Sequence, residues 1–184
     1  MAAFQSGVPP AKQGDYAYLL HIIRSMKITG KGACVLPHGV LFRGNAEGVI
    51  RRNLIQRGVI KGIIGLPANL FYGTGIPVCL ILLDKEHAQA SKGIFMIDVS
   101  KGFRKDGPKN RLREQDIHRI VDTYNRQLET PGYSRMVPVT EISTKLFAKW
   151  KKANTSLLKG LDLDSHAGWR GWNSRRAGAR RSRA

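Results

Sequence analysis

The 184-residue sequence is most informative at first for what it lacks. It has only two cysteines, and no apolar run reaches the roughly 20 residues that span a bilayer. Its N-terminus has no basic segment followed by an apolar core, so it does not match a secretory signal. Cys34 and Cys79 lie in apolar runs without the spacing of a metal site or a redox pair. We therefore expect a cytoplasmic protein with buried thiols, no disulfide and no membrane contact.

The usual catalytic motifs are also missing. There is no glycine-rich phosphate loop of the P-loop or dinucleotide type, and no Gly-x-Ser-x-Gly nucleophile motif. The histidines stand apart from one another: His21, His38, His87, His118 and His166. His38 follows a predicted strand, where catalytic groups of α/β sheets often lie, but an isolated histidine there favours a structural hydrogen bond. Asp98 also ends a predicted strand, as a binding carboxylate or as part of a surface turn. We expect no catalytic residue and no metal site in this chain.

The charge is strongly positive and unevenly distributed. The formal net charge is +18, and residues 143–184 carry half of it, with 11 basic and two acidic side chains. A basic surface favours polyanions, so nucleic acid is the expected partner class. The tail at 143–184 also contains Trp169 and Trp172, which would suit single-stranded nucleic acid. Its composition nevertheless favours a disordered or frameshifted end.

The remaining sequence alternates helical and strand patterns. Apolar residues at helical spacing predict helices over 14–28, 45–58 (with Asn45 as N-cap) and 114–128. The apolar faces are Tyr16, Leu19, Leu20, Ile23 and Met26 in the first helix, Val49, Ile50 and Leu54 in the second, and Ile117, Ile120, Val121 and Tyr124 in the third. Short apolar runs predict strands over 30–37, 59–66, 76–83 and 93–99. This order is typical of an α/β sheet. The runs at 59–66 and 76–83 are apolar throughout, which indicates burial on both faces of the sheet.

The connection between these two runs is too short for a crossover helix, so they are expected to be antiparallel neighbours. Residues 67–75, Pro-Ala-Asn-Leu-Phe-Tyr-Gly-Thr-Gly, place Phe71 and Tyr72 in this loop. A hairpin turn needs no aromatic rings. By itself the pattern leaves two interpretations open: the rings cap the hydrophobic edge of the sheet, or they contact a ligand.

The run from "VLPHGVLFRGNAEGVIRRNLI" to "GIIGLPANLFYGTGIP" resembles the modification (M) subunit of type I restriction-modification systems, and the resemblance continues to about Ile142. Those subunits are adenine-specific DNA methyltransferases that use S-adenosylmethionine and act with specificity (S) and restriction (R) subunits on DNA. The resemblance implies a doubly wound, Rossmann-like sheet of strand order 3-2-1-4-5-7-6. Here 30–37 would be the fifth strand, and 59–66 and 76–83 the sixth and the antiparallel seventh.

In that family an aromatic ring between the last two strands stacks on the adenine once it is flipped out of the duplex. The resemblance assigns this role to Phe71, with Tyr72 beside it. Such stacking is worth roughly 1–3 kcal/mol per base, which offsets part of the cost of extruding the base.

The sequence departs from the family pattern in two motifs. It contains neither the glycine-rich cofactor loop nor the Asn-Pro-Pro-aromatic motif that holds the adenine amine. We therefore expect residues 1–142 to be the C-terminal half of the methyltransferase sheet, from the fifth strand onward, inactive alone and without most of the cofactor site. Two alternatives remain. In one, a second polypeptide completes a split enzyme; in the other, the chain is a non-enzymatic, basic nucleic-acid-binding protein.

Overall fold

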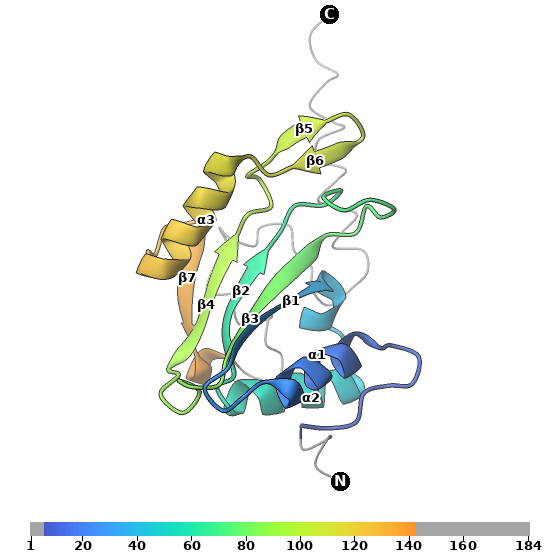
Figure 1. Cartoon of the computed structure of the whole chain (residues 1–184), viewed down its shortest axis with the longest axis vertical. Coiled ribbons are helices and arrows are strands. Elements are labelled where there is room, and N and C mark those ends of the chain that lie inside the picture. Colours follow the sequence, from blue (N-terminus) through green and yellow to red (C-terminus); the bar gives the residue numbers. More distant parts are fainter. Residues whose placement is uncertain (1–5, 143–184) are drawn as a thin grey trace, which may run out of the picture.

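The computed structural model of the chain describes residues 6–142 (Figure 1). The interpretations of the basic tail, 143–184, lie outside these residues. Within 6–142, no helix is long and apolar enough to cross a membrane.

A five-stranded sheet forms the centre of the molecule. Its strands are β1 (Lys31–Pro37), β2 (Ile60–Gly65), β3 (Val78–Asp84), β4 (Gly93–Asp98) and β7 (Ser134–Pro138). They are ordered β1-β3-β2-β4-β7. β3 runs antiparallel to both β1 and β2, whereas β2 and β4 are parallel and β7 is antiparallel to β4. The predicted antiparallel pair is confirmed, and β1-β3-β2 is the fifth-seventh-sixth order that the resemblance implies.

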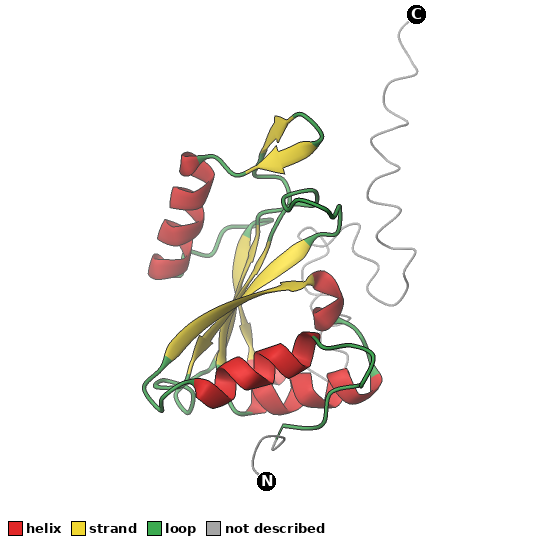
Figure 2. Ribbon diagram, turned by 45° about the vertical axis from the view of Figure 1, so that its right-hand side comes forward, coloured by secondary structure: helices red, strands yellow, loops and turns green. Residues whose placement is uncertain are grey.

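Two helices cover one face of the sheet (Figure 2). α1 (Asp15–Ser25) buries the predicted apolar positions from Tyr16 to Ile23. α2 (Asn45–Gln56) buries Ile50 and Leu54, which have no exposed surface. Val49 was predicted to lie on the same buried face, and this prediction is wrong, because its side chain is 46% exposed. The N-cap prediction for Asn45 is also wrong: Gly44 is the N-cap, and Asn45 begins the helix with a φ of 52°.

A third helix covers part of the other face (Figure 2). α3 (Glu114–Arg126) packs Ile120 and Tyr124 over Ile64 and Phe95 of the sheet. Gly62 of β2 permits this close approach, because a Cβ there would lie 2.7 Å from a ring carbon of Tyr124. The predicted apolar face of this helix also included Ile117 and Val121. For these two residues the prediction is wrong, because both side chains are about half exposed. Helices on both faces give the expected α/β architecture.

The two thiols differ in burial. Cys79 on β3 is fully buried, which raises the pKa of its thiol to about 12, with Cys34 nearby adding to the effect. Cys34 on β1 is only partly buried, so the prediction of two buried thiols holds in full for Cys79 alone.

The sequence patterns missed the short elements. A hairpin of β5 (Arg104–Asp106) and β6 (Lys109–Arg111) turns at Gly107, which has a φ of 55°. It projects beyond the main sheet, next to the loop between β2 and β3 (Figure 1). Two short 3-10 helices, η1 (His38–Leu41) and η2 (Val139–Glu141), follow β1 and β7.

Candidate functional site

The candidate site lies at the rim of the sheet where β1 and β2 end. Since both strands are antiparallel to β3, they run parallel to each other, and β3 begins at the rim where they finish. Ligands of open α/β sheets bind outside the carboxyl ends of such strands. His38 and the loop at 67–75 therefore meet at one edge of the molecule.

The loop presents two aromatic side chains of unequal exposure. Tyr72 is 91% exposed, and Phe71 is 41% exposed. Phe71 therefore has some ring surface packed on the protein and some open to a ligand, whereas Tyr72 projects into solvent.

The backbone of the loop follows a defined path. Asn69 and Gly73 both adopt positive φ values, 56° and 76°. Asn tolerates this left-handed conformation better than most residues, and Gly adopts it freely. The Thr74 hydroxyl accepts a hydrogen bond from the Ile76 N–H at 3.1 Å. These local contacts turn the chain sharply on either side of the aromatic pair.

Hairpin β5–β6 braces the same loop. The Asn110 backbone N–H donates to the Asn69 carbonyl at 2.8 Å, and its side-chain amide donates to the Ala68 carbonyl at 2.6 Å. Lys109 Nζ donates to the carbonyls of Phe71 at 2.8 Å and Thr74 at 3.3 Å. The hairpin therefore fixes the loop on both sides of the rings. Sequence reasoning missed these two residues, although the Asp106-Gly107 dipeptide is a signal for a tight hairpin.

His38 lies beneath the loop, at the end of β1. Its Nε2 atom is buried, and a Cβ on Gly65 would lie 3.7 Å from that atom. Burial lowers the pKa of His38 to about 4, although a hydrogen bond with the backbone of Val78 opposes the shift. The ring is therefore neutral at pH 7 and packs the base of the rim. Nearby, the Val40 carbonyl accepts hydrogen bonds from Tyr16 and Arg51, which anchor η1.

Asp98, the other strand-end residue, belongs to a turn. Its Oδ1 accepts a hydrogen bond from the Ser100 N–H at 2.9 Å. This contact agrees with the surface-turn interpretation of Asp98.

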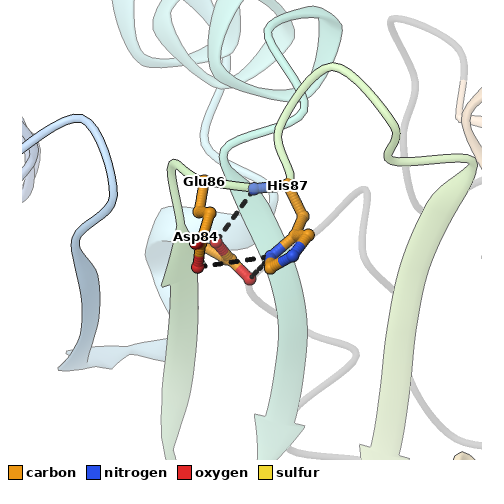
Figure 3. Close-up of side chains that lie close together, drawn as sticks. All are labelled: Asp84, Glu86 and His87. Atoms are coloured by element: carbon orange, nitrogen blue, oxygen red, sulfur yellow. Dashed lines mark hydrogen bonds and ion pairs between the residues drawn. The ribbon is translucent and has the colours of Figure 1, made fainter.

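A separate charged cluster lies at the opposite end of β3. Asp84, Glu86 and His87 bring one potential ligand atom each to within 4.8 Å of one another (Figure 3). Asp84 accepts hydrogen bonds from the His87 N–H at 3.1 Å and from Nδ1 at 3.0 Å, and Lys31 Nζ lies 3.7 Å from Glu86. Burial raises the pKa of Asp84, but the His87 contacts and Lys31 outweigh it and leave the pKa below its usual value. Since Asp84 is hydrogen-bonded to His87 and Glu86 is paired with Lys31, we interpret the cluster as a polar network that closes the turn after β3.

Comparison with known proteins identifies the family. The model of the family described as N-6 DNA Methylase matches residues 2–155. The chain belongs to the N-6 DNA methylase family. It is 35% identical over 145 residues to the type I restriction enzyme MjaVII methylase subunit of Methanocaldococcus jannaschii, covering 75% of this chain and 24% of that protein. It is 30% identical over 158 residues to the MpnII methylase subunit of Mycoplasma pneumoniae, covering 86% of this chain and 27% of that protein.

A solved structure agrees with this assignment. The type I restriction-modification methyltransferase subunit of Streptococcus thermophilus superposes with a TM-score of 0.74 at 36% identity, covering 79% of this chain and 32% of that one. The resemblance to type I M subunits is therefore confirmed, together with the fold. The methylase chain spans about a quarter of the length of its two curated relatives.

The connections that follow the strands at this rim are known for the described residues, 6–142. β1 leads through Pro37 into η1, β2 leads into the aromatic loop, and β4 leads into the turn at Asp98. Within 6–142, none of these strands continues through a glycine-rich turn into a helix N-terminus, the arrangement that suits a bound nucleotide. At this rim the described residues present the aromatic pair and the hydrogen-bonded backbone of the loop.

Proposed function

We propose that this chain is the base-holding part of a site-specific, adenine-specific DNA methyltransferase subunit of a type I restriction-modification system. The observation that carries the proposal is the exposed pair Phe71 and Tyr72 on a loop held by hydrogen bonds at the carboxyl-end rim of the sheet. Membership of the N-6 DNA methylase family supports adenine as the base.

The role of Phe71 follows from its partial exposure. An adenine extruded from the duplex loses stacking and pairing that cost a few kcal/mol, and an aromatic ring at the rim restores part of this. Phe71 is 41% exposed, and Lys109 Nζ donates to its backbone carbonyl, so the backbone that carries the ring is held in place before the base arrives. A backbone that is already ordered loses less conformational entropy on binding. Tyr72 stands next to it with its hydroxyl in solvent.

Methyl transfer itself requires groups that this sequence does not contain. S-adenosylmethionine would supply the methyl group. The glycine-rich loop that would hold it, and the Asn-Pro-Pro-aromatic motif that would hold the adenine amine, lie outside this sequence. On this proposal the chain is inactive alone. A specificity subunit would choose the DNA site, and a restriction subunit would join the same assembly.

The test is whether the full chain prefers an unpaired adenine. Equilibrium binding is measured with two fluorescent duplexes of equal length, one fully paired and one with a single adenine opposite an abasic site. The wild type should bind the second about 10-fold more tightly, because no pairing has to be broken and stacking is worth roughly 1–3 kcal/mol.

Phe71→Ala should remove most of this preference, and Phe71→Trp should keep it. Ile117→Ala, an exposed apolar position on α3, is the matched control and should behave as wild type. Equal affinity of the wild type for both duplexes would overturn the proposal.

A further inference from the structure

Hairpin β5–β6 carries an unusual concentration of positive charge. The segment 101–113 has six basic side chains and one acidic side chain, Asp106. The basic residues are Lys101, Arg104, Lys105, Lys109, Arg111 and Arg113. Lys109 is bound to the aromatic loop and Arg113 to Asp116, which leaves the strand residues Arg104, Lys105 and Arg111 as the exposed charges of the hairpin.

Two of these charges stand directly opposite each other. Arg104 and Arg111 are register partners in the antiparallel pair, so their side chains lie on the same face of the hairpin. Like charges in this position repel each other and destabilise a two-stranded pair. The only acidic group in the segment, Asp106, lies 3.6 Å from Arg111 in an exposed contact, and Arg104 is left to face Arg111. An anion between the two guanidinium groups would remove this repulsion.

The hairpin is also fixed to the loop that carries the rings. Asn110 and Lys109, on the same short strand as Arg111, bond to carbonyls on both sides of Phe71 and Tyr72. Arg104 and Arg111 are therefore held at a set distance from the rings. A nucleotide whose base reaches the rings brings its own phosphates with it, and phosphate contacts are what fix a protein on its nucleic acid.

We propose that Arg104 and Arg111 bind the backbone phosphates of the DNA strand whose base is held by Phe71 and Tyr72. This inference rests on the proposed function, which supplies the base at the rim. It adds a second contact surface: the loop binds the base, and the hairpin binds the strand that delivers it. Arginine suits this role because its planar, forked guanidinium can donate two hydrogen bonds to one phosphate.

The test is the salt dependence of DNA binding by the full chain. Each phosphate contact contributes about 0.7–0.9 to the slope of log K against log salt. The double variant Arg104→Ala with Arg111→Ala should therefore lower the magnitude of the slope by about 1.5. This change should appear with both the paired duplex and the duplex with an unpaired adenine.

The chain offers a closely matched control, Arg52→Ala with Arg126→Ala. Arg52 is exposed on α2, and Arg126 pairs with Asp122 at 3.5 Å, much as Arg111 pairs with Asp106. Arg126 is the last residue of α3, about 18 Å along the helix from the hairpin end. The control removes the same net charge as the hairpin pair, but at positions away from the proposed phosphate contacts. It should therefore leave the slope close to that of wild type.

A third variant distinguishes the loss of positive charge from a disturbance of the fold. Arg104→Lys with Arg111→Lys keeps both charges, so the slope should return to near the wild-type value. A slope that falls equally in the hairpin and control pairs, falls in neither, or falls in the lysine pair as well would overturn the inference. The preference for unpaired adenine, measured in the same titrations, tests the proposed function separately.

Discussion

His38 shows how burial can dominate the protonation of a single side chain. Its ring packs at the end of β1, and burial holds its pKa at about 4, against an ordinary value of 6.5. The charged form is therefore disfavoured in the folded chain. The sequence favoured a structural role for His38, and the geometry supports that interpretation.

This shift predicts a pH dependence of stability. Between about pH 6.5 and 4 the unfolded chain binds a proton at His38 that the folded chain does not, so stability is complete above pH 6.5 and falls as the pH drops. The expected slope from this residue is about 1.4 kcal/mol per pH unit. Urea unfolding at pH 7, 6 and 5 should show a smaller loss in His38→Asn than in wild type.

The control for this measurement is His118→Asn, at an exposed position on α3. It should lose stability with falling pH as the wild type does. Identical slopes for wild type and His38→Asn would show that the proton is bound equally in both states.

At the scale of elements, the hairpin and the loop depend on each other. The Asn110 side chain is 7% exposed and donates to the Ala68 carbonyl. Removing the amide leaves a carbonyl without this donor, which costs about 1–3 kcal/mol where the group is buried. Asn110→Ala should therefore lower the free energy of unfolding by about 1–2 kcal/mol.

Hydrogen exchange gives the local measurement for this variant. The amides of residues 67–75 should exchange faster in Asn110→Ala, while those of α1 keep their wild-type protection. Lys105→Ala changes the exposed register partner of Asn110 and serves as the control, with unchanged exchange in the loop. Unchanged loop exchange in Asn110→Ala would mean that the loop is ordered by its own turns.

Elements of different kinds were predictable to different degrees. β2 and β3 follow from continuous apolar runs, because both faces of these strands pack against other groups. Hairpin β5–β6 has no such run, since its strand residues are mostly charged and exposed, and β7 is short and ends in proline. The apolar stripe of α3 was overestimated because the helix lies over one side of the sheet and leaves Ile117 in solvent.

The residues of the candidate site also differ in whether the sequence could predict them. Phe71 and Tyr72 were found because an aromatic pair in a turn is unexpected and because the surrounding run matches a known family. Asn110 was not, because it lies 42 residues beyond Ala68 and meets it only after the sheet has formed. A long-range hydrogen bond of this kind leaves no local pattern in the sequence.

At the scale of the whole molecule, the described part of the sheet has an edge strand that ends at the candidate rim. β1 forms one edge of the sheet and, among the described residues, pairs only with β3. Val35 on this strand is 46% exposed. An edge strand with unpaired backbone groups is a template for a further strand. A completing polypeptide could therefore add to the sheet at β1.

The corresponding prediction concerns activity. The chain alone should transfer no labelled methyl group from S-adenosylmethionine to DNA. Mixed with a polypeptide that carries the glycine-rich loop and the Asn-Pro-Pro-aromatic motif of a type I M subunit, it should restore transfer to adenine. Phe71→Ala should reduce that transfer at least about 5-fold, the lower bound of the stacking contribution. Methyl transfer by the isolated chain would contradict the prediction.

The position of β3 also affects how the molecule can be assembled during synthesis. β1 and β2 leave the ribosome before β3, yet they do not pair with each other, because β3 lies between them and pairs with both. The core of the sheet must therefore wait until residue 84 has emerged, and the first two strands remain unpaired until then. Contacts between residues distant in sequence slow folding and prolong this exposure. The apolar strands β1 and β2 are therefore exposed to aggregation, or to capture by a chaperone, until β3 has been made.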